Sequence, residues 1–128
     1  MPGMNILIVD DEPDVQPLFE QRFRKEVKRG DVQLSFAHSG EGAFSYMEQH
    51  PSEVVLILSD INMPGMSGIE LLRRIRQKYN APPPIVMMIT AYSDEENYQQ
   101  AMKYGADDFL TKPLDFNLLK EKLKILVF

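Results

Sequence analysis

Four short apolar runs in this chain each end in polar side chains that can take part in chemistry. The runs begin at Ile6, Val54, Ile85 and Phe109, and they lead to Asp10 and Asp11, Asp60, Thr90 and Lys112, respectively. Short runs of β-branched and aliphatic residues between helix-like segments are typical of buried parallel strands. Because the carboxyl ends of parallel strands line the functional crevice of an open α/β sheet, we expect three carboxylates, one hydroxyl and one ammonium group to meet at one edge.

This set of side chains predicts a metal site. Asp10 and Asp11 alone would indicate an ordinary polar turn, Asp60 alone an Asx turn, and Thr90 alone a β-branched strand residue. Three carboxylates brought together repel each other unless a cation lies among them. The combination of the acids with Lys112 therefore favours a cation-binding crevice over these structural readings.

Strand-like and helix-like segments alternate five times along the chain. Apolar periodicity and turn residues predict strands at 4–10, 32–37, 54–59, 85–90 and 107–111, and helices at 13–29, 39–50, 68–79, 93–104 and 115–127. The apolar residues expected on the inner side of the first helix are Val15, Leu18, Phe19, Phe23 and Val27. This alternation predicts an α/β fold, with a parallel five-stranded sheet and helices on both faces. A doubly wound, flavodoxin-like (βα)5 order of 2-1-3-4-5 is the expected topology, although periodicity does not reveal strand order.

Length and composition restrict the classes of protein further. The chain has 128 residues, of which 44% are hydrophobic, and this size suits one domain with a true core. Its net charge of −5 gives no electrostatic reason for direct nucleic-acid binding. No apolar stretch approaches the roughly 20 residues of a membrane span. The chain has no cysteine, which excludes disulfides, and we expect a cytoplasmic location.

Four segments, taken together and in order, resemble the receiver domain of two-component response regulators. They are Ile8–Glu12 (IVDDE), Asp60–Gly68 (DINMPGMSG), Ile89–Ala91 (ITA) and Gly105–Pro113 (GADDFLTKP). The resemblance extends over residues 5–124 and implies one receiver domain at 4–127. It also implies a signalling switch that takes a phosphoryl group from a histidine kinase and catalyses only its own phosphorylation and slow dephosphorylation.

The resemblance implies a role for each residue of the crevice. Asp60 resembles the phosphoacceptor. Asp11 and Asp60, with the backbone carbonyl of Asn62, resemble the ligands of Mg²⁺ (or Mn²⁺), and Asp10 resembles an acid that holds the metal through water. Lys112 resembles the lysine that pairs with the phosphoryl oxygens. Mg²⁺ suits this site because it takes oxygen ligands and neutralises charge on a transferring phosphoryl group.

The same resemblance implies a conformational switch. Thr90 resembles the hydroxyl that moves to hydrogen-bond the phosphoryl group, and Phe109 occupies the place of the aromatic residue that swings inward. Their movement is expected to alter the face formed by the segments 93–104, 107–111 and 115–127. A cis peptide is expected between Lys112 and Pro113.

The expected partners are a sensor histidine kinase or a phosphotransfer protein, and a downstream output domain or protein partner. Direct contact with nucleic acid or membrane is not expected. A homodimer is a further hypothesis, in which lysines of the last helix pair with acids of a second copy. The lysines are Lys120, Lys122 and Lys124, and the acids are Asp107 or Asp108.

Three other functions compete with this one. A Mg²⁺-dependent phosphohydrolase with an aspartyl nucleophile is the main alternative, but the haloacid-dehalogenase-like enzymes need a second Asp where this chain has Asn62. A flavodoxin needs a hydroxyl- and glycine-rich phosphate loop after the first strand, where this chain has acidic residues. A degenerate receiver that serves only as a scaffold is disfavoured because every expected site residue is present.

Overall fold

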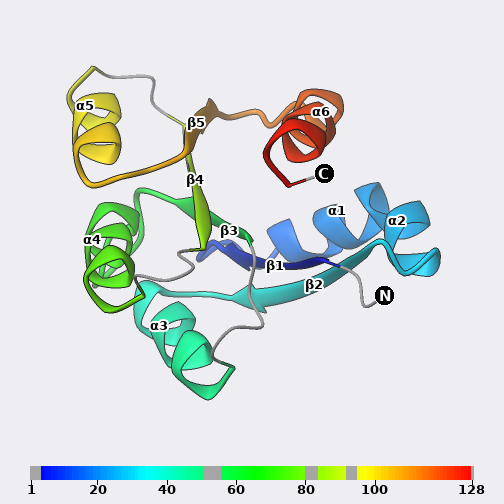
Figure 1. Cartoon of the computed structure of the whole chain (residues 1–128), viewed down its shortest axis with the longest axis horizontal. Helices are drawn as coiled ribbons and strands as arrows, with labels where there is room; N and C mark the ends of the chain where they lie inside the picture. Colours follow the sequence, from blue (N-terminus) through cyan, green and yellow to red (C-terminus); the bar gives the residue numbers. More distant parts are fainter. Residues whose placement is uncertain (1–3, 51–55, 80–83, 92–94, 128) are drawn as a thin grey trace.

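The computed structural model describes residues 4–50, 56–79, 84–91 and 95–127, and a parallel five-stranded sheet forms its centre. The strands are β1 (Met4–Val9), β2 (Val32–Ala37), β3 (Leu56–Asp60), β4 (Ile85–Thr90) and β5 (Asp108–Thr111). They pair in the order β2-β1-β3-β4-β5, as Figure 1 shows. The α/β class and the 2-1-3-4-5 order expected from the sequence are therefore confirmed.

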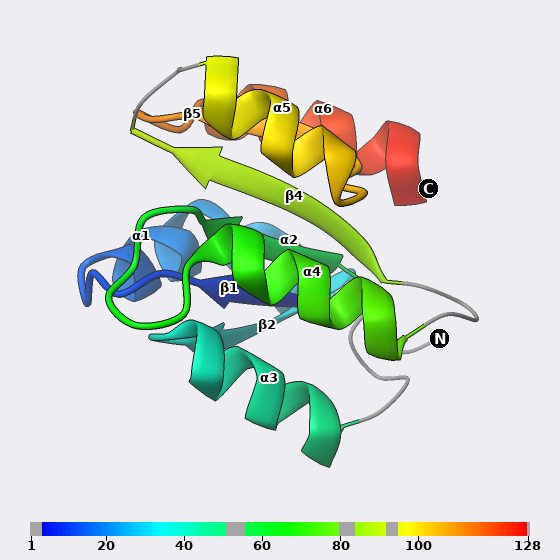
Figure 2. The same cartoon turned by 90° about the vertical axis from the view of Figure 1, so that its left-hand side faces the viewer.

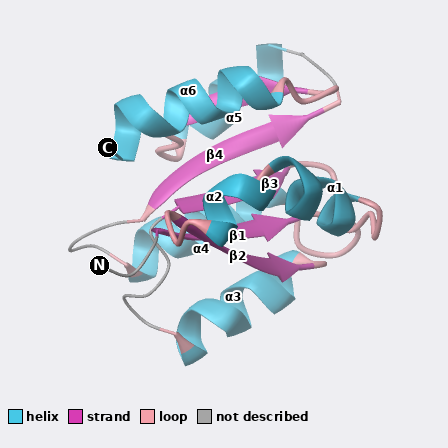
Figure 3. Cartoon of the chain, turned by 90° about the vertical axis from the view of Figure 1, so that its right-hand side faces the viewer, coloured by secondary structure: helices cyan, strands magenta, loops and turns pink. Residues whose placement is uncertain are grey.

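Helices cover both faces of this sheet. On one face lie α3 (Gly40–Gln49), α4 (Gly68–Lys78) and α5 (Glu95–Lys103), which Figure 2 shows in front of the strands. On the other lie α1 (Val15–Arg22), α2 (Arg24–Lys28) and α6 (Phe116–Val127), seen in Figure 3. Because both faces are covered, apolar residues of the central strand β1 are buried on both sides: Ile6 and Ile8 pack beneath α1 and α6, and Leu7 and Val9 beneath α3 and α4.

The helix predicted over 13–29 is in fact two helices that meet at Phe23. The backbone of Phe23 lies at φ −104° and ψ 15°, outside the regular α conformation. Its ring is 1% exposed and packs edge-on against Phe116 of α6 with ring centroids 6.2 Å apart, while Lys120 donates to the carbonyl of Arg22 at 2.7 Å. The two helices thus bend around the contact with α6.

Two apolar residues of this segment were wrongly expected to face the core. Leu18 is 41% exposed and Val27 is 43% exposed. The buried side of α1 is set by Phe19 and Phe23, whose rings stack at a centroid distance of 5.9 Å. Since the helical phase changes at Phe23, an inner face extrapolated from regular spacing does not continue to Val27.

Other boundaries differ little from the prediction. Asp60 belongs to β3 itself, and β5 begins one residue later than expected, at Asp108. The predicted start of the third strand at residue 54 and the predicted helix start at residue 93 lie outside the described residues. Within the described part of the chain, no helix has the length and apolar character needed to cross a membrane.

Candidate functional site

The three acids of the predicted crevice lie together at the carboxyl edge of the sheet. Asp10 and Asp11 follow β1, and Asp60 is the last residue of the neighbouring β3. One carboxylate oxygen from each acid lies within 4.8 Å of the other two. Asp10 and Asp60 are each only 7% exposed, whereas Asp11 is exposed. The convergence expected from the strand ends is therefore present.

Lys112 reaches this cluster from the end of β5. Its Nζ lies 3.1 Å from Oδ2 of Asp10 and 3.4 Å from Oδ2 of Asp60. Its backbone N–H donates to the carbonyl of Thr90 at 2.8 Å, which fixes the segment beside β4. The peptide bond to Pro113 is cis, as expected. One ammonium group thus contacts two of the three carboxylates.

The charge of the cluster is not balanced by its own residues. Three carboxylates and one ammonium group leave two formal negative charges. Burial, followed by the negative charge of Asp10, raises the pKa of Asp60 despite the opposing effect of Lys112. Burial opposes the charged form of Lys112, but hydrogen bonding to Asp10 and the charge of Asp60 raise its pKa overall. A divalent cation with a preference for oxygen ligands fits this donor set.

Thr90 and Asn62 connect the neighbouring strand β4 to the cluster. Thr90 is fully buried at the end of β4, and the side-chain amide of Asn62 donates to its Oγ1 at 3.4 Å. Interaction with the Asn62 backbone also opposes the rise in the pKa of the Asp60 carboxyl. Asn62 therefore contacts both the acid and the hydroxyl.

Phe109 is the second residue of β5. It is half-buried and packs edge-on against Tyr98 of α5, with ring centroids 5.4 Å apart at 80°. Tyr98 itself is 43% exposed. The sequence indicated Phe109, but no pattern indicated Tyr98 as its partner because that contact depends on how α5 packs against β5.

Gly68, the first residue of α4, allows this helix to begin directly behind Asp60. A Cβ at position 68 would lie 2.1 Å from the carbonyl oxygen of Asp60 and 2.8 Å from Cε of Met88. The backbone N–H of Gly68 donates to the carbonyl of Ile61 at 2.9 Å. The site therefore requires a residue without a side chain at position 68. The glycine-containing segment Asp60–Gly68 did not by itself reveal this reason.

The acids of the homodimer hypothesis have partners within the chain. Asp108 Oδ2 lies 2.8 Å from Nζ of Lys122, and Asp107 Oδ2 lies 2.9 Å from Nη2 of Arg76. Lys120 pairs with Glu26 at 2.9 Å. A dimer built on these charges would have to exchange intramolecular pairs for intermolecular ones, and it stays a prediction.

A hollow of about 290 Å³ opens beside the acids, between α1 and the segment that joins β5 to α6. Asp10, Asp60 and Lys112 form its polar end, and Leu18 and Phe116 line its apolar side. The exposure of Leu18 is thus a feature of a recess that leads to the cluster.

Known proteins resemble this chain in sequence and in fold. The family model for the response regulator receiver domain matches residues 6–124. Response regulator RppA of Synechocystis is 33% identical over 123 residues, which cover 96% of this chain and 50% of that protein. The structure of response regulator TrrA from Thermotoga maritima in complex with Mg²⁺-BeF has a TM-score of 0.80 and 31% identity, with 97% and 99% of the two chains covered.

A third match is the receiver domain of the Saccharomyces cerevisiae response regulator Ssk1, solved together with the histidine phosphotransfer protein Ypd1. Its TM-score is 0.79 at 25% identity, with 98% of this chain and 94% of that chain covered. The present chain spans half or less of the length of several curated relatives. In three cases the share is 50%, 45% and 25%.

Proposed function

Because this chain belongs to the response regulator receiver family, whose domains act in phosphorelay signalling, we propose that Asp60 accepts the phosphoryl group. The observation that carries this proposal is the position of Asp60, a buried carboxylate at a strand end with Lys112 at 3.4 Å and two further acids beside it. Phosphoryl transfer needs positioning and charge compensation more than acid–base help, and this site offers both.

The acidic pocket is the place where a receiver domain binds Mg²⁺, and the ligands in this chain would be Asp11, Asp60 and the backbone carbonyl of Asn62. Asp10 would hold the ion through water. The same donor set accepts Mn²⁺. When bound, the ion would balance the two uncompensated charges of the cluster and would help to stabilise the charge that develops on the phosphoryl oxygens.

In the proposed reaction a carboxylate oxygen of Asp60 attacks the phosphorus of a phosphohistidine. The new O–P bond forms as the P–N bond breaks, and the electron pair of that bond leaves with the imidazole of the donor. The product is an aspartyl phosphate. Lys112 would then move its contact from the carboxylate of Asp60 to a phosphoryl oxygen, where a compact cation is favourable.

The switch that we propose begins at Thr90. Its hydroxyl would donate to the new phosphoryl group, and the contact with the amide of Asn62 would change. The edge-on pair of Phe109 and Tyr98 would then rearrange, since space near Thr90 becomes free for the ring of Phe109. This alters the face formed by α5, β5 and α6.

One charge-assisted hydrogen bond supplies about 1.5–3 kcal/mol, less than the roughly 5.5 kcal/mol that a complete population shift needs. Either contacts of the phosphoryl group with Lys112 and the metal supply the remainder, or the shift is partial and partner binding completes it.

For partners we propose a histidine kinase or phosphotransfer protein as donor and an output domain or protein as recipient. The recess beside Leu18, which ends at Asp60 and Lys112, offers an apolar surface next to the reactive carboxylate. The Ssk1 receiver, which has the same fold, binds a histidine phosphotransfer protein. We further propose that residues 4–127 form one receiver domain.

The phosphohydrolase alternative is not favoured. The family match covers residues 6–124 and so includes all of the site. Position 62 carries an amide that contacts Thr90 and not a carboxylic acid that could protonate a leaving group. The proposed catalysis is therefore limited to the domain's own phosphorylation and its slow reversal.

Phosphotransfer to Asp60→Asn tests the proposal. We expect the unmodified domain to become labelled by radioactive acetyl phosphate in the presence of Mg²⁺, and Asp60→Asn to remain unlabelled. Asp31→Asn, which removes an exposed acid paired with Arg29, is the matched control and should be labelled normally. Equal labelling of Asp60→Asn would place the acceptor elsewhere.

A further inference from the structure

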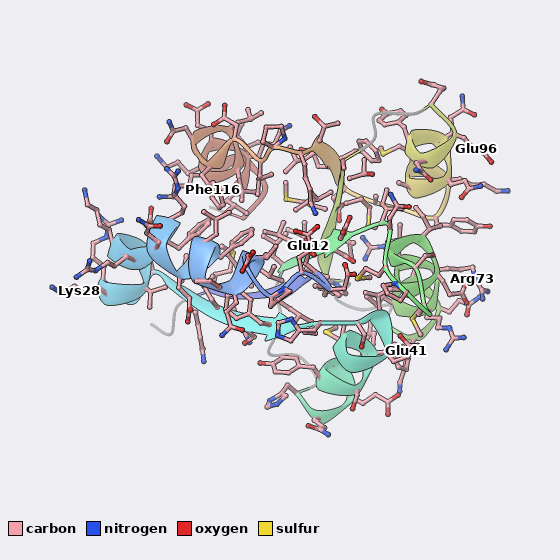
Figure 4. The ribbon with its side chains drawn as sticks, turned by 180° about the vertical axis from the view of Figure 1, so that it is seen from behind. Glu12, Lys28, Glu41, Arg73, Glu96 and Phe116 are labelled. Carbon is pink, nitrogen blue, oxygen red and sulfur yellow. The ribbon has the colours of Figure 1, made fainter. Side chains whose placement is uncertain are left out.

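Glu41 has no place in the proposed chemistry, yet its carboxylate lies against the loop that carries Asn62. This residue is in the first turn of α3, and Figure 4 shows it beside the segment that leads into α4. Its Oε1 accepts a hydrogen bond from the backbone N–H of Met66 at 3.4 Å. The contact joins α3 to the loop 61–67, which follows the proposed phosphoacceptor.

The carboxylate of Glu41, an exposed residue, lies against the turn of the loop at Gly65. Gly65 has φ +74°, and a Cβ at this position would lie 2.7 Å from Oε2 of Glu41. A Cβ on Gly40, the residue before Glu41, would lie 2.9 Å from Cβ of Met66. Gly40 therefore permits the start of α3 to approach Met66, while the positive φ of Gly65 favours glycine at the turn beside the carboxylate.

The two ends of this loop are held by backbone hydrogen bonds. Ile61 donates to the carbonyl of Ile89 at 3.0 Å and accepts from Gly68 at 2.9 Å. The side chain of Met63 is buried in the core. Glu41 adds a contact at Met66, between the buried side chain of Met63 and the hydrogen bond of Gly68.

We propose that Glu41 is a positioning residue for the metal-binding loop. By holding the backbone of Met66, its carboxylate restricts the conformations of the loop 61–67, and with them the position of the backbone carbonyl of Asn62 relative to the acid cluster. This inference rests on the proposed function, because it assumes that Asn62 contributes a metal ligand. Residues that orient ligands affect metal affinity although they do not touch the metal.

A simpler role for Glu41 is to interact with the positive end of the α3 dipole, as acids in a first turn do. Two substitutions separate the roles. Glu41→Asp keeps the charge at the helix start but shortens the side chain, so it loses the reach to Met66. Glu41→Gln removes the charge but keeps both the length and an oxygen that can accept the hydrogen bond. If Glu41 positions the loop, Glu41→Asp should be the more damaging substitution. If Glu41 acts only on the helix dipole, Glu41→Gln should be the more damaging one.

The measurement is the Mg²⁺ dissociation constant of the full chain, from NMR titration, together with hydrogen exchange of the Met66 amide. For Glu41→Asp we expect binding roughly 5- to 10-fold weaker, near the lower end of the effect of residues that orient ligands, and faster exchange at Met66. Glu41→Gln should remain within about 2-fold of the unmodified chain. Glu48→Asp, in the same helix but paired with Lys78 at 3.1 Å, is the matched control and should change neither quantity.

Two results would overturn the role of Glu41. One is unchanged Mg²⁺ affinity in a folded Glu41→Asp protein, and the other is a larger loss in Glu41→Gln than in Glu41→Asp. Failure of the unmodified chain to bind Mg²⁺ would contradict the metal site itself, so the two failures can be told apart.

Discussion

Lys112 contacts Asp10 through a 3.1 Å pair that joins the residue after the last strand to the residue after the first. The same ammonium group lies 3.4 Å from Asp60 on the strand between them. Three separate parts of the sequence therefore share one electrostatic site. Because the contacts are partly shielded from water, they are stronger than surface ion pairs.

Replacing Lys112 by Met should destabilise the metal-free protein. The change leaves two buried carboxylates side by side, and we expect a loss of about 1–3 kcal/mol in the free energy of unfolding. Saturating Mg²⁺ should reduce this loss, since the ion supplies the missing positive charge. Urea unfolding with and without Mg²⁺ measures both values.

Lys122→Met is the control for that experiment. It breaks a pair with Asp108, away from the cluster, and the side chain of Lys122 is 30% exposed against 26% for Lys112. Its effect should be the same with and without Mg²⁺. A Lys112→Met penalty that Mg²⁺ leaves unchanged would argue against a cation site shared with Lys112.

Mg²⁺ itself should stabilise the unmodified chain. Binding to the folded state alone adds about 2.7 kcal/mol at a hundred times the dissociation constant. Asp11→Asn should lose most of this gain, while Asp14→Asn, an exposed acid outside the cluster, should keep it. Thermal unfolding over a range of Mg²⁺ concentrations gives the comparison, and identical curves with and without the ion would contradict the metal assignment.

The sequence predicted much of this fold for a clear physical reason. Buried parallel strands must be apolar on both faces, so Ile6–Val9 and Ile85–Ile89 are recognisable, and polar side chains just after such strands must meet at one edge. The carboxylates and Lys112 could therefore be grouped before any contact was known. Their individual roles came from the resemblance to the receiver family.

Features that depend on tertiary packing were not predictable in this way. The break at Phe23 follows from a contact with Phe116, nearly a hundred residues away, and local periodicity has no information about it. The contacts of Glu41 with the turn at Gly65 depend on how α3 packs beside the loop 61–67, which comes later in the chain. The sequence likewise did not indicate that Asp108 pairs with Lys122 within the chain. The dimer hypothesis therefore used the same charges for a contact between two copies.

Gly68→Ala should disturb both the fold and the site. The new methyl group would lie 2.1 Å from the carbonyl oxygen of Asp60, and relief of that overlap should cost about 1–3 kcal/mol of stability and weaken Mg²⁺ binding. Gly42→Ala is a milder comparison, because a Cβ there would approach Oγ of Ser39 only to 3.1 Å, a tight contact that a shift of a few tenths of an ångström relieves, and it should cost less. Equal stability of Gly68→Ala and the unmodified protein, measured by urea unfolding, would contradict the tight approach of α4 to Asp60.

Glu70 should give a local pH dependence on α4. Hydrogen bonds from Arg73 and Arg74 lower the pKa of its carboxyl from 4.5 to about 2. A lowered pKa means that the folded state favours the ionised form, so the stabilisation is complete above pH 4.5 and is lost as the pH falls toward 2. The stability difference between the unmodified chain and Glu70→Gln should therefore shrink over this range.

The direct check on Glu70 is a carboxyl-carbon NMR titration. We expect its midpoint near 2, rising when salt is added, because the pair is exposed to solvent. A midpoint near 4.5 that salt does not change would contradict the predicted pairing with the two arginines.

The most direct test of the phosphoacceptor site is a crystal structure of this chain with Mg²⁺ and beryllium fluoride, which mimics a phosphoryl group. The proposal predicts beryllium bonded to a carboxylate oxygen of Asp60, with Mg²⁺ held by Asp11, Asp60 and the carbonyl of Asn62, and with Nζ of Lys112 against a fluorine. An Asp60 side chain that carries no beryllium and points away from Asp11 and Lys112 would contradict it.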